Sequence, residues 1–174
     1  MSAQPQMTEL SLGRIVRPFQ RGDEAAFRSL NEEWISKYFR VEEKDRQTLG
    51  NPQKYILGPG GEIFMALVDG DVVGCVALVK MSKTTMELAK MAVDENYRGQ
   101  GIGRALIAAA IEWARSRRLH RIYLETNHTL TPAINLYRSM GFTDVPEDRV
   151  MESPYRRADV FMEMWLVPQW LECI

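Results

Sequence analysis

Arg98-Gly99-Gln100-Gly101-Ile102-Gly103-Arg104 is the most informative stretch of this chain. It lies between a predicted strand over residues 86–93 and a predicted helix over residues 102–117, in which apolar residues recur at helical spacing. Glycines carry no side chain, so the backbone of this turn can approach a bound group closely. The helix that begins there points unpaired N–H groups and the positive end of its dipole toward the turn. With an arginine at each end, the stretch predicts a phosphate-binding turn.

Taken alone, the turn leaves three interpretations open. A dinucleotide-binding turn needs Gly-x-Gly-x-x-Gly directly after a strand, but the third glycine comes one residue early and residues 94–97 intervene. Glu125 does fall where a ribose-binding acid would lie. A nucleoside-triphosphate loop is disfavoured because no Gly-Lys-Ser/Thr ends the turn. The third interpretation is a tight turn that binds nothing.

Composition narrows the class of protein. The 174 residues, 45% of them hydrophobic, favour one domain with a real core. The net charge of −1 argues against a nucleic-acid binder. No metal site is predicted, because His120 and His128 lack further ligands at metal spacing. The two distant cysteines, Cys75 and Cys173, are typical of a reducing compartment, and no apolar run is long enough for a bilayer. We therefore expect a cytoplasmic protein with no membrane segment and no targeting leader.

The order of patterns predicts an α/β chain. Polar residues 1–12 are expected to form a flexible leader, and residues 13–174 one domain. The predicted strands are residues 15–17, 63–69, 72–81, 86–93, 121–125, 142–145 and 159–167, and the predicted helices are residues 23–39, 42–49, 102–117 and 132–140, with Asp23 as the first cap. Residues 86–125 form a strand–helix–strand unit whose strands run parallel. The prediction is a single-domain mixed, mostly antiparallel twisted sheet of six to seven strands flanked by helices.

Two blocks of residues resemble the motifs of the GNAT superfamily of acetyltransferases. In the first, Leu88-Ala89-Lys90-Met91-Ala92-Val93-Asp94 precedes the glycine turn, where Arg98, Gly101 and Gly103 match the acyl-CoA pattern Arg/Gln-x-x-Gly-x-Gly/Ala. The second comprises Leu124-Glu125, Ala133-Ile134-Asn135-Leu136-Tyr137 and Gly141-Phe142. The order of the predicted elements fits the family as well, so the resemblance spans nearly the whole chain after residue 12. It implies the acyl-CoA N-acyltransferase fold.

The resemblance implies that acetyl-CoA is the cosubstrate. The strand before the turn is expected to diverge from its parallel neighbour, so that the backbone of Met91, Ala92 and Val93 holds the pantetheine arm. The pyrophosphate would be held by Arg98, Gly99, Gln100, Gly101, Ile102, Gly103 and Arg104. Asn127 is a further candidate for contact with the pantetheine or the substrate, and a turn residue that caps its local backbone is an equal alternative.

Transfer of an acyl group from a thioester to an amine needs a base for the ammonium and an acid for the leaving thiolate. Tyr137 occupies the position of the family's tyrosine, so the resemblance implies that it is the acid. From spacing alone, it would pack against Trp113 or Phe142. Glu125 and Glu87 both stand where family members place a catalytic glutamate, and each could act directly or through water. The pattern favours Glu125 slightly.

We therefore expect an N-acetyltransferase that acts on a primary amine of a small molecule. Acetylation of protein N-termini or lysines remains an alternative, and so does a CoA-binding module without turnover. Charged residues over 32–49 and in the long predicted loop 146–158 are expected to shape the acceptor pocket. Apolar Trp165, Trp170 and Leu171 fit either a homodimer contact or the closing of the core.

Overall fold

A computed structural model describes residues 8–11 and 13–169 of the chain. Its strands form one sheet in the order β1-β2-β3-β4-β5-β6-β8-β7. The strands are β1 (Thr8–Ser11), β2 (Arg14–Pro18), β3 (Glu62–Val68), β4 (Asp71–Lys80), β5 (Thr85–Val93), β6 (Arg121–Thr126), β7 (Thr143–Asp144) and β8 (Val160–Trp165). Only β5 and β6 pair in parallel, and every other neighbouring pair is antiparallel. The predicted mixed, mostly antiparallel sheet is confirmed, with β1 as an eighth strand.

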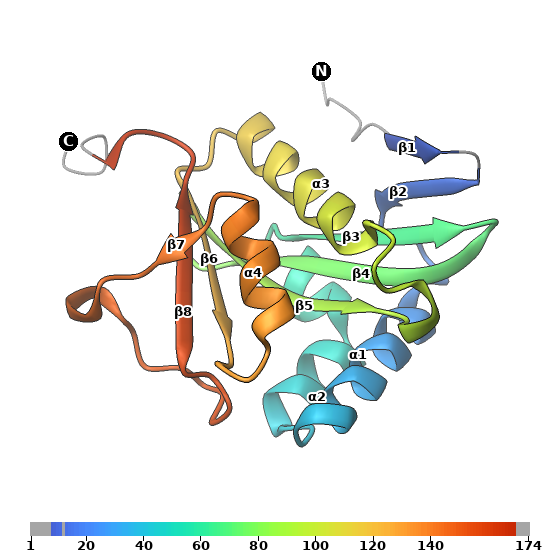
Figure 1. Cartoon of the computed structure of the whole chain (residues 1–174), viewed down its shortest axis with the longest axis horizontal. Helices are drawn as coiled ribbons and strands as arrows, with labels where there is room; N and C mark the ends of the chain where they lie inside the picture. Colours follow the sequence, from blue (N-terminus) through green and yellow to red (C-terminus); the bar gives the residue numbers. More distant parts are fainter. Residues whose placement is uncertain (1–7, 12, 170–174) are drawn as a thin grey trace.

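Helices cover both faces of the sheet (Figure 1). They are α1 (Glu24–Tyr38), α2 (Glu43–Gly50), α3 (Ile102–Ser116) and α4 (Thr131–Ser139). Shorter helical turns are η1 (Gln53–Leu57), η2 (Glu95–Tyr97) and η3 (Glu147–Arg149). In Figure 1, α3 and α4 lie on one side of the sheet, and α1 and α2 lie on the other. None of the described helices has the length and apolar character needed to cross a membrane.

Each face of the sheet has its own core. Leu106 and Ile107 of α3 are fully buried against Val76 and Leu78 of β4, because the apolar stripe of the helix faces the sheet. On the opposite face, Phe27 of α1 packs with Met65, Cys75 and Ala77. The alternation of side chains along β3 and β4 supplies both cores at once.

An irregularity in β5 determines how the sheet opens. Ala89 pairs with Ala77 and Ala92 pairs with Cys75, so β5 contains one more residue than β4 between these pairs. Lys90 lies in this bulge in the left-handed conformation, with φ +52°. The pairing of β5 with β6 covers Thr85–Glu87 against Arg121–Tyr123 and ends just before this bulge. The two strands therefore diverge, as the resemblance implied.

Some expectations differ from the structure. Part of the segment predicted as a leader, residues 8–11, forms strand β1 beside β2. Asp23 precedes α1 but makes no capping hydrogen bond, because Arg17 and the backbone N–H of Gln20 engage its carboxylate. Trp165 ends β8 with the Arg121 guanidinium 5.4 Å from its ring centre. Trp170, Leu171 and Cys173 lie outside the described residues.

The substitution Leu106→Ala tests the packing of α3 on the sheet. We expect it to lower the free energy of unfolding by about 2–5 kcal/mol, because it leaves a cavity beneath the helix. Denaturant unfolding measures the change. Met151→Ala is the control, because Met151 is 46% exposed and its truncation should cost under about 0.5 kcal/mol. Equal losses in the two variants would contradict the assigned core.

Candidate active site

A cavity of about 640 Å³ opens where β5 and β6 diverge. Its walls include α1 residues such as Ile35 on one side of the sheet and α4 residues such as Leu136 on the other. The predicted site residues that line it are Glu87, Met91, Ala92, Val93, Arg98, Gly99, Gly101, Ile102, Gly103, Arg104, Glu125 and Tyr137. The cavity thus continues from one face of the sheet to the other through the gap between two strands.

The glycine turn presents free N–H groups to this cavity. Gly99 and Gly101 have φ values of +72° and +81°, a conformation that side chains disfavour. Gly101 is the N-cap of α3, and the first helical hydrogen bond runs from the Ala105 N–H to the Gly101 carbonyl. Within the described part of the chain, the N–H groups of residues 99–104 have no acceptor. The turn therefore fits a diphosphate.

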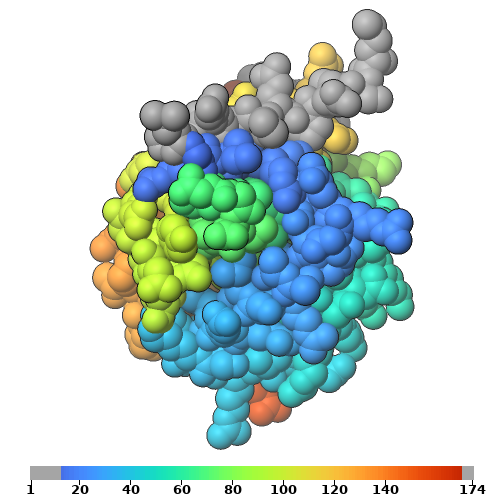
Figure 2. All heavy atoms as spheres, turned by 90° about the vertical axis from the view of Figure 1, so that its right-hand side faces the viewer, coloured from blue at the N-terminus to red at the C-terminus, as the bar shows by residue number. Residues whose placement is uncertain are grey.

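The side chains around the turn hold its shape. Arg14 of β2 donates to the Gln100 carbonyl at 3.1 Å and to its side-chain oxygen at 2.6 Å. Figure 2 shows the yellow-green segment that contains this turn beside the green tip of the β3–β4 hairpin, close to the blue N-terminal strands. Gln100 does not line the cavity, and its side chain fastens the turn to β2. Arg98 donates to Tyr38 at 3.0 Å, and Arg104 donates to Ser139 at 2.8 Å.

Tyr137 reaches the cavity from α4. It is 8% exposed and packs edge-to-face with Phe142, at 5.9 Å between ring centres. Among the described residues its hydroxyl makes no hydrogen bond. Burial raises the pKa of Tyr137 to about 12, so the hydroxyl keeps its proton at neutral pH. Tyr137 thus packs against Phe142 and also forms part of the cavity wall.

Glu87 and Glu125 reach the cavity from the same face of the sheet. Glu87 pairs with Tyr123, and Glu125 is two residues further along β6, which directs its side chain to the side on which Tyr123 lies. Glu125 accepts hydrogen bonds from Tyr123 at 3.2 Å and from Ser153 at 2.5 Å. Glu87 accepts none from the described residues. Burial, and then repulsion from Glu125, raise the pKa of Glu87 to about 7.

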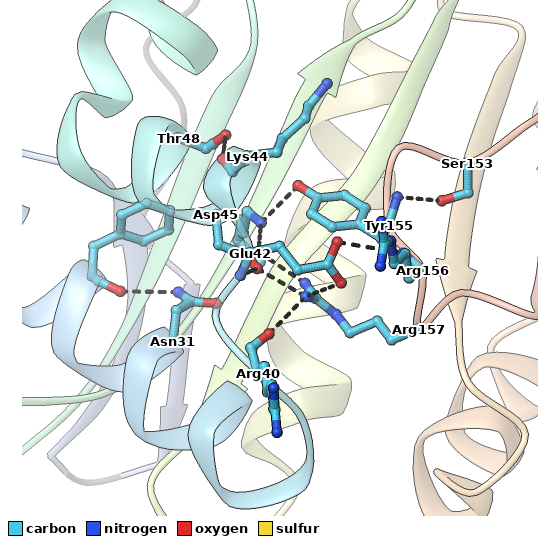
Figure 3. Close-up of polar contacts among 12 residues, drawn as sticks. Asn31, Arg40, Glu42, Lys44, Asp45, Thr48, Ser153, Tyr155, Arg156 and Arg157 are labelled. Carbon is cyan, nitrogen blue, oxygen red and sulfur yellow. Dashed lines mark hydrogen bonds and ion pairs between the residues drawn. The ribbon is translucent and has the colours of Figure 1, made fainter.

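The loop between β7 and β8, residues 145–159, closes one end of the cavity. Ser153, Tyr155 and Arg157 are partly buried, whereas the residues between them are exposed. This alternation is typical of an extended segment with one face turned inward. Ser153 contacts Glu125, and Tyr155 accepts a hydrogen bond from Lys90 at 3.0 Å. Figure 3 shows the side chains of Tyr155 and Arg157 directed toward Glu42 and Asp45 at the start of α2.

Asp45 joins this loop to the sheet. Its buried carboxylate accepts a hydrogen bond from Lys90 at 2.6 Å and two from Arg157 at 2.8 Å each. Burial by itself would raise the pKa of Asp45, but the Arg157 hydrogen bond and the nearby Lys90 outweigh it and lower the pKa to about 2. Burial lowers the pKa of Lys90, and the Asp45 carboxylate opposes that shift. Sequence reasoning did not identify this cluster.

Asn127 is one predicted contact that the structure does not bring into the cavity. Its amide donates to the Arg157 carbonyl at 2.7 Å, and its oxygen accepts from the backbone and hydroxyl of Thr129. Asn127 is not part of the cavity lining. Its role is to shape the turn after β6, the alternative that the sequence left open.

Comparison with known proteins decides the family. The model of the acetyltransferase (GNAT) family matches residues 25–142, which include the glycine turn, both glutamates and Tyr137. The chain belongs to this family. Membership confirms the resemblance and the fold predicted from the sequence, and places the chain in a family of acetyltransferases.

The relatives of this GNAT chain act on different acceptors. N-acetylaspartate synthetase from Rattus norvegicus is 37% identical over 91 residues, which are 52% of this chain and 30% of that protein. Streptothricin acetyltransferase from Escherichia coli is 37% identical over 80 residues, 46% of each chain. The match thus spans less than half the length of either relative. A GNAT acetyltransferase structure from Staphylococcus aureus superimposes with a TM-score of 0.81 at 20% identity, and covers 88% of this chain and 99% of its own.

The raised pKa of Glu87 makes the stability of this GNAT chain depend on pH. Between the ordinary value of 4.5 and about 7, the folded state keeps a proton that the unfolded chain releases. The contribution of Glu87 is therefore present below pH 4.5 and is lost as the pH rises through 7. We expect Glu87→Gln to remove this loss, which is on the order of 2 kcal/mol between pH 5 and 8.

Urea unfolding at pH 5, 6, 7 and 8 measures this dependence. Glu152→Gln is the matched control, because Glu152 is exposed on the β7–β8 loop, and it should follow the wild-type curve. The assignment fails if the stability of Glu87→Gln falls with pH as steeply as that of the wild type.

Proposed function

We propose that this protein transfers the acetyl group of acetyl-CoA to a primary amine of a small molecule by direct attack of the amine. The observation that carries the proposal is the cavity through the sheet. It connects the open N–H groups of residues 99–104 with Tyr137 on one side and with Glu87 and Glu125 on the other. One channel therefore holds an anion-binding turn, an acid and two carboxylates.

The residues present fit the cosubstrate. The amides of the glycine turn suit its diphosphate, and the backbone of Met91, Ala92 and Val93 lies along the cavity beyond the last pair of β5 with β6. That backbone can bond the amides of the pantetheine arm as a neighbouring strand would. When bound, acetyl-CoA supplies an activated acetyl thioester.

We assign the role of base to Glu87. A base works best with a pKa near the working pH, and the pKa of Glu87 is about 7. Glu125 is held by Tyr123 and Ser153, and its negative charge helps to raise the pKa of Glu87. The sequence slightly favoured Glu125 as the base. Its engaged oxygens suit it better to holding the ammonium and tuning Glu87.

We assign the role of acid to Tyr137, whose hydroxyl stays protonated beside the cavity. One ammonium proton passes to Glu87, and the N–C bond forms as the C–S bond breaks. Tyr137 then protonates the leaving sulfur, and a second proton from nitrogen restores its hydroxyl. The proton on Glu87 leaves to solvent, so the reaction yields an amide, a thiol and one proton.

The end of the cavity that the β7–β8 loop closes, here called the acceptor end, favours a small molecule over a peptide. The β7–β8 loop is fastened across it by Ser153, Tyr155 and Arg157, where an extended peptide would have to lie. Acetylation of a flexible protein terminus is the second candidate function.

The buried free thiol of Cys75 supports a cytoplasmic location. We also propose that Trp165, which is partly buried at the end of β8, takes part in a homodimer contact.

Tyr137→Phe tests the acid. We expect turnover to fall by roughly 10²–10⁴-fold, because the sulfur loses its proton donor. Acetyl-CoA affinity should stay within about twofold, as measured by a thermal-shift titration. Phe142→Leu is the control for altered packing, since it disturbs the same ring contact but keeps the hydroxyl. Unchanged turnover in Tyr137→Phe would exclude this role.

The dependence of kcat/KM on pH tests the two glutamates. We expect a rise with pH that levels off above about 7, because Glu87 must be ionised. Glu125→Gln should shift this rise to lower pH, since it removes the negative charge that raises the pKa of Glu87. Glu87→Gln should abolish the rise and most of the activity. If Glu87→Gln kept the wild-type profile, another group would be the base.

A further inference from the structure

At the acceptor end of the cavity, the cationic side chains have ion-pair partners among the described residues, whereas two of the carboxylates do not. The titratable side chains of the lining there are Glu87, Lys90, Glu125, Tyr155 and Arg157. The carboxyl of Glu87 has no hydrogen-bond partner among the described residues, and the two bonds of Glu125 come from neutral hydroxyls. Neither carboxylate is therefore neutralised by a direct ion pair.

Both cations of this end are already engaged. Lys90 and Arg157 both bind the buried carboxylate of Asp45, and Arg157 also lies 3.3 Å from Glu42. Both cations also lie over the Tyr155 ring. The Lys90 Nζ is 4.8 Å and the Arg157 guanidinium carbon is 4.5 Å from the ring centre. Lys44 attracts Glu87 from α2, but it is not part of the cavity lining.

At this end of the cavity, a cationic group of a ligand is therefore attracted and an anionic group is repelled. An ammonium group between Glu87 and Glu125 gains attraction from both and relieves their mutual repulsion. A carboxylate beside that ammonium would meet the Glu125 charge, and the two cations of the lining at this end are already paired with Asp45 and Glu42. It would also lose water on entering, without replacing the hydrogen bonds.

We propose that the acceptor is a primary amine that carries no carboxylate next to the reacting nitrogen, such as a diamine or an aryl-alkyl amine, rather than an amino acid. This inference rests on the proposed function and specifies its substrate class. It separates this protein from its relative N-acetylaspartate synthetase, whose name indicates an amino-acid acceptor. The positioned pair of carboxylates selects the ammonium, and Asp45 withholds the two cations from an anionic group.

Matched pairs of acceptors test the proposal. Phenylalanine and 2-phenylethylamine differ only in the carboxylate beside their single amine, and so do tyrosine and tyramine. With purified full-length protein and acetyl-CoA, release of the CoA thiol gives kcat/KM for each. We expect the member without the carboxylate to be favoured by at least roughly tenfold in a pair that reacts, as one unscreened charge beside another implies. Equal or better use of the amino acids would overturn the proposal and leave the proposed function standing.

A different result would remove the proposed function itself. If acetyl-CoA raises the melting temperature but no amine, amino acid or peptide releases thiol, the protein is a binding module, and the inference about the acceptor falls with its premise. Turnover of peptides alone would instead support the second candidate function and contradict both statements.

Asp45→Asn tests the cause of the selectivity. It removes the negative charge that Lys90 and Arg157 share, so the preference within each pair should shift toward the amino acid by roughly tenfold. Asp23→Asn is the matched control, because it breaks the Arg17 ion pair outside the cavity lining and should leave the ratio unchanged. Where Asp45→Asn does not fold, Glu42→Gln removes one of the two carboxylates that engage Arg157 and should shift the ratio in the same direction by a smaller factor. An unchanged ratio in a folded variant would show that Asp45 does not set the acceptor class.

Discussion

The site depends on one backbone constraint, the early end of the β5–β6 pairing and the bulge that follows it in β5. Parallel strands that stayed paired would satisfy their own backbone groups and leave no space between them. Lys90 holds the bulge in a left-handed conformation that costs a residue with a side chain on the order of 1 kcal/mol or more. Such a conformation persists when its surroundings determine it. Here the Lys90 nitrogen is fixed by Asp45 and Tyr155, so the contacts of the acceptor end also stabilise the bulge that creates it.

The ion cluster around Asp45 ties together parts of the chain that are distant in sequence. Lys90 lies 45 residues from Asp45, and Arg157 lies 112 residues from it. A buried carboxylate is costly unless its oxygens are bonded, and here both cations and the Glu42 N–H bond it. Removing one partner would leave an uncompensated charge, which is the expensive case. The β7–β8 loop is therefore fixed against α2 and β5, and the acceptor end has a defined wall.

Local patterns predicted what depends on local physics. Helical spacing identified α3, the apolar runs identified β3 and β4, and the glycine turn identified the open N–H groups, because each follows from residues close in the chain. The bulge at Lys90 had no such signal, since residues 85–93 contain no glycine or proline. The Asp45 cluster was also missed, because the sequence does not show which charged residues of separate segments form ion pairs. The alternating burial of Ser153, Tyr155 and Arg157 also had no signal in the sequence, because serine and arginine are as polar as the residues between them.

The two glutamates show how surroundings divide the work between identical side chains. Both come from neighbouring strands and line the same cavity, yet only Glu125 receives hydrogen bonds, from Tyr123 and Ser153. Those bonds fix its orientation. Glu87 has burial and the charge of Glu125 acting on it, and both disfavour its ionised form. A carboxyl whose pKa is near 7 can exchange a proton with an amine at neutral pH, whereas a carboxylate held by two hydrogen bonds can position the ammonium. The asymmetry comes from the β7–β8 loop, which supplies Ser153, so the segment that closes the acceptor end also separates the roles of the two carboxylates.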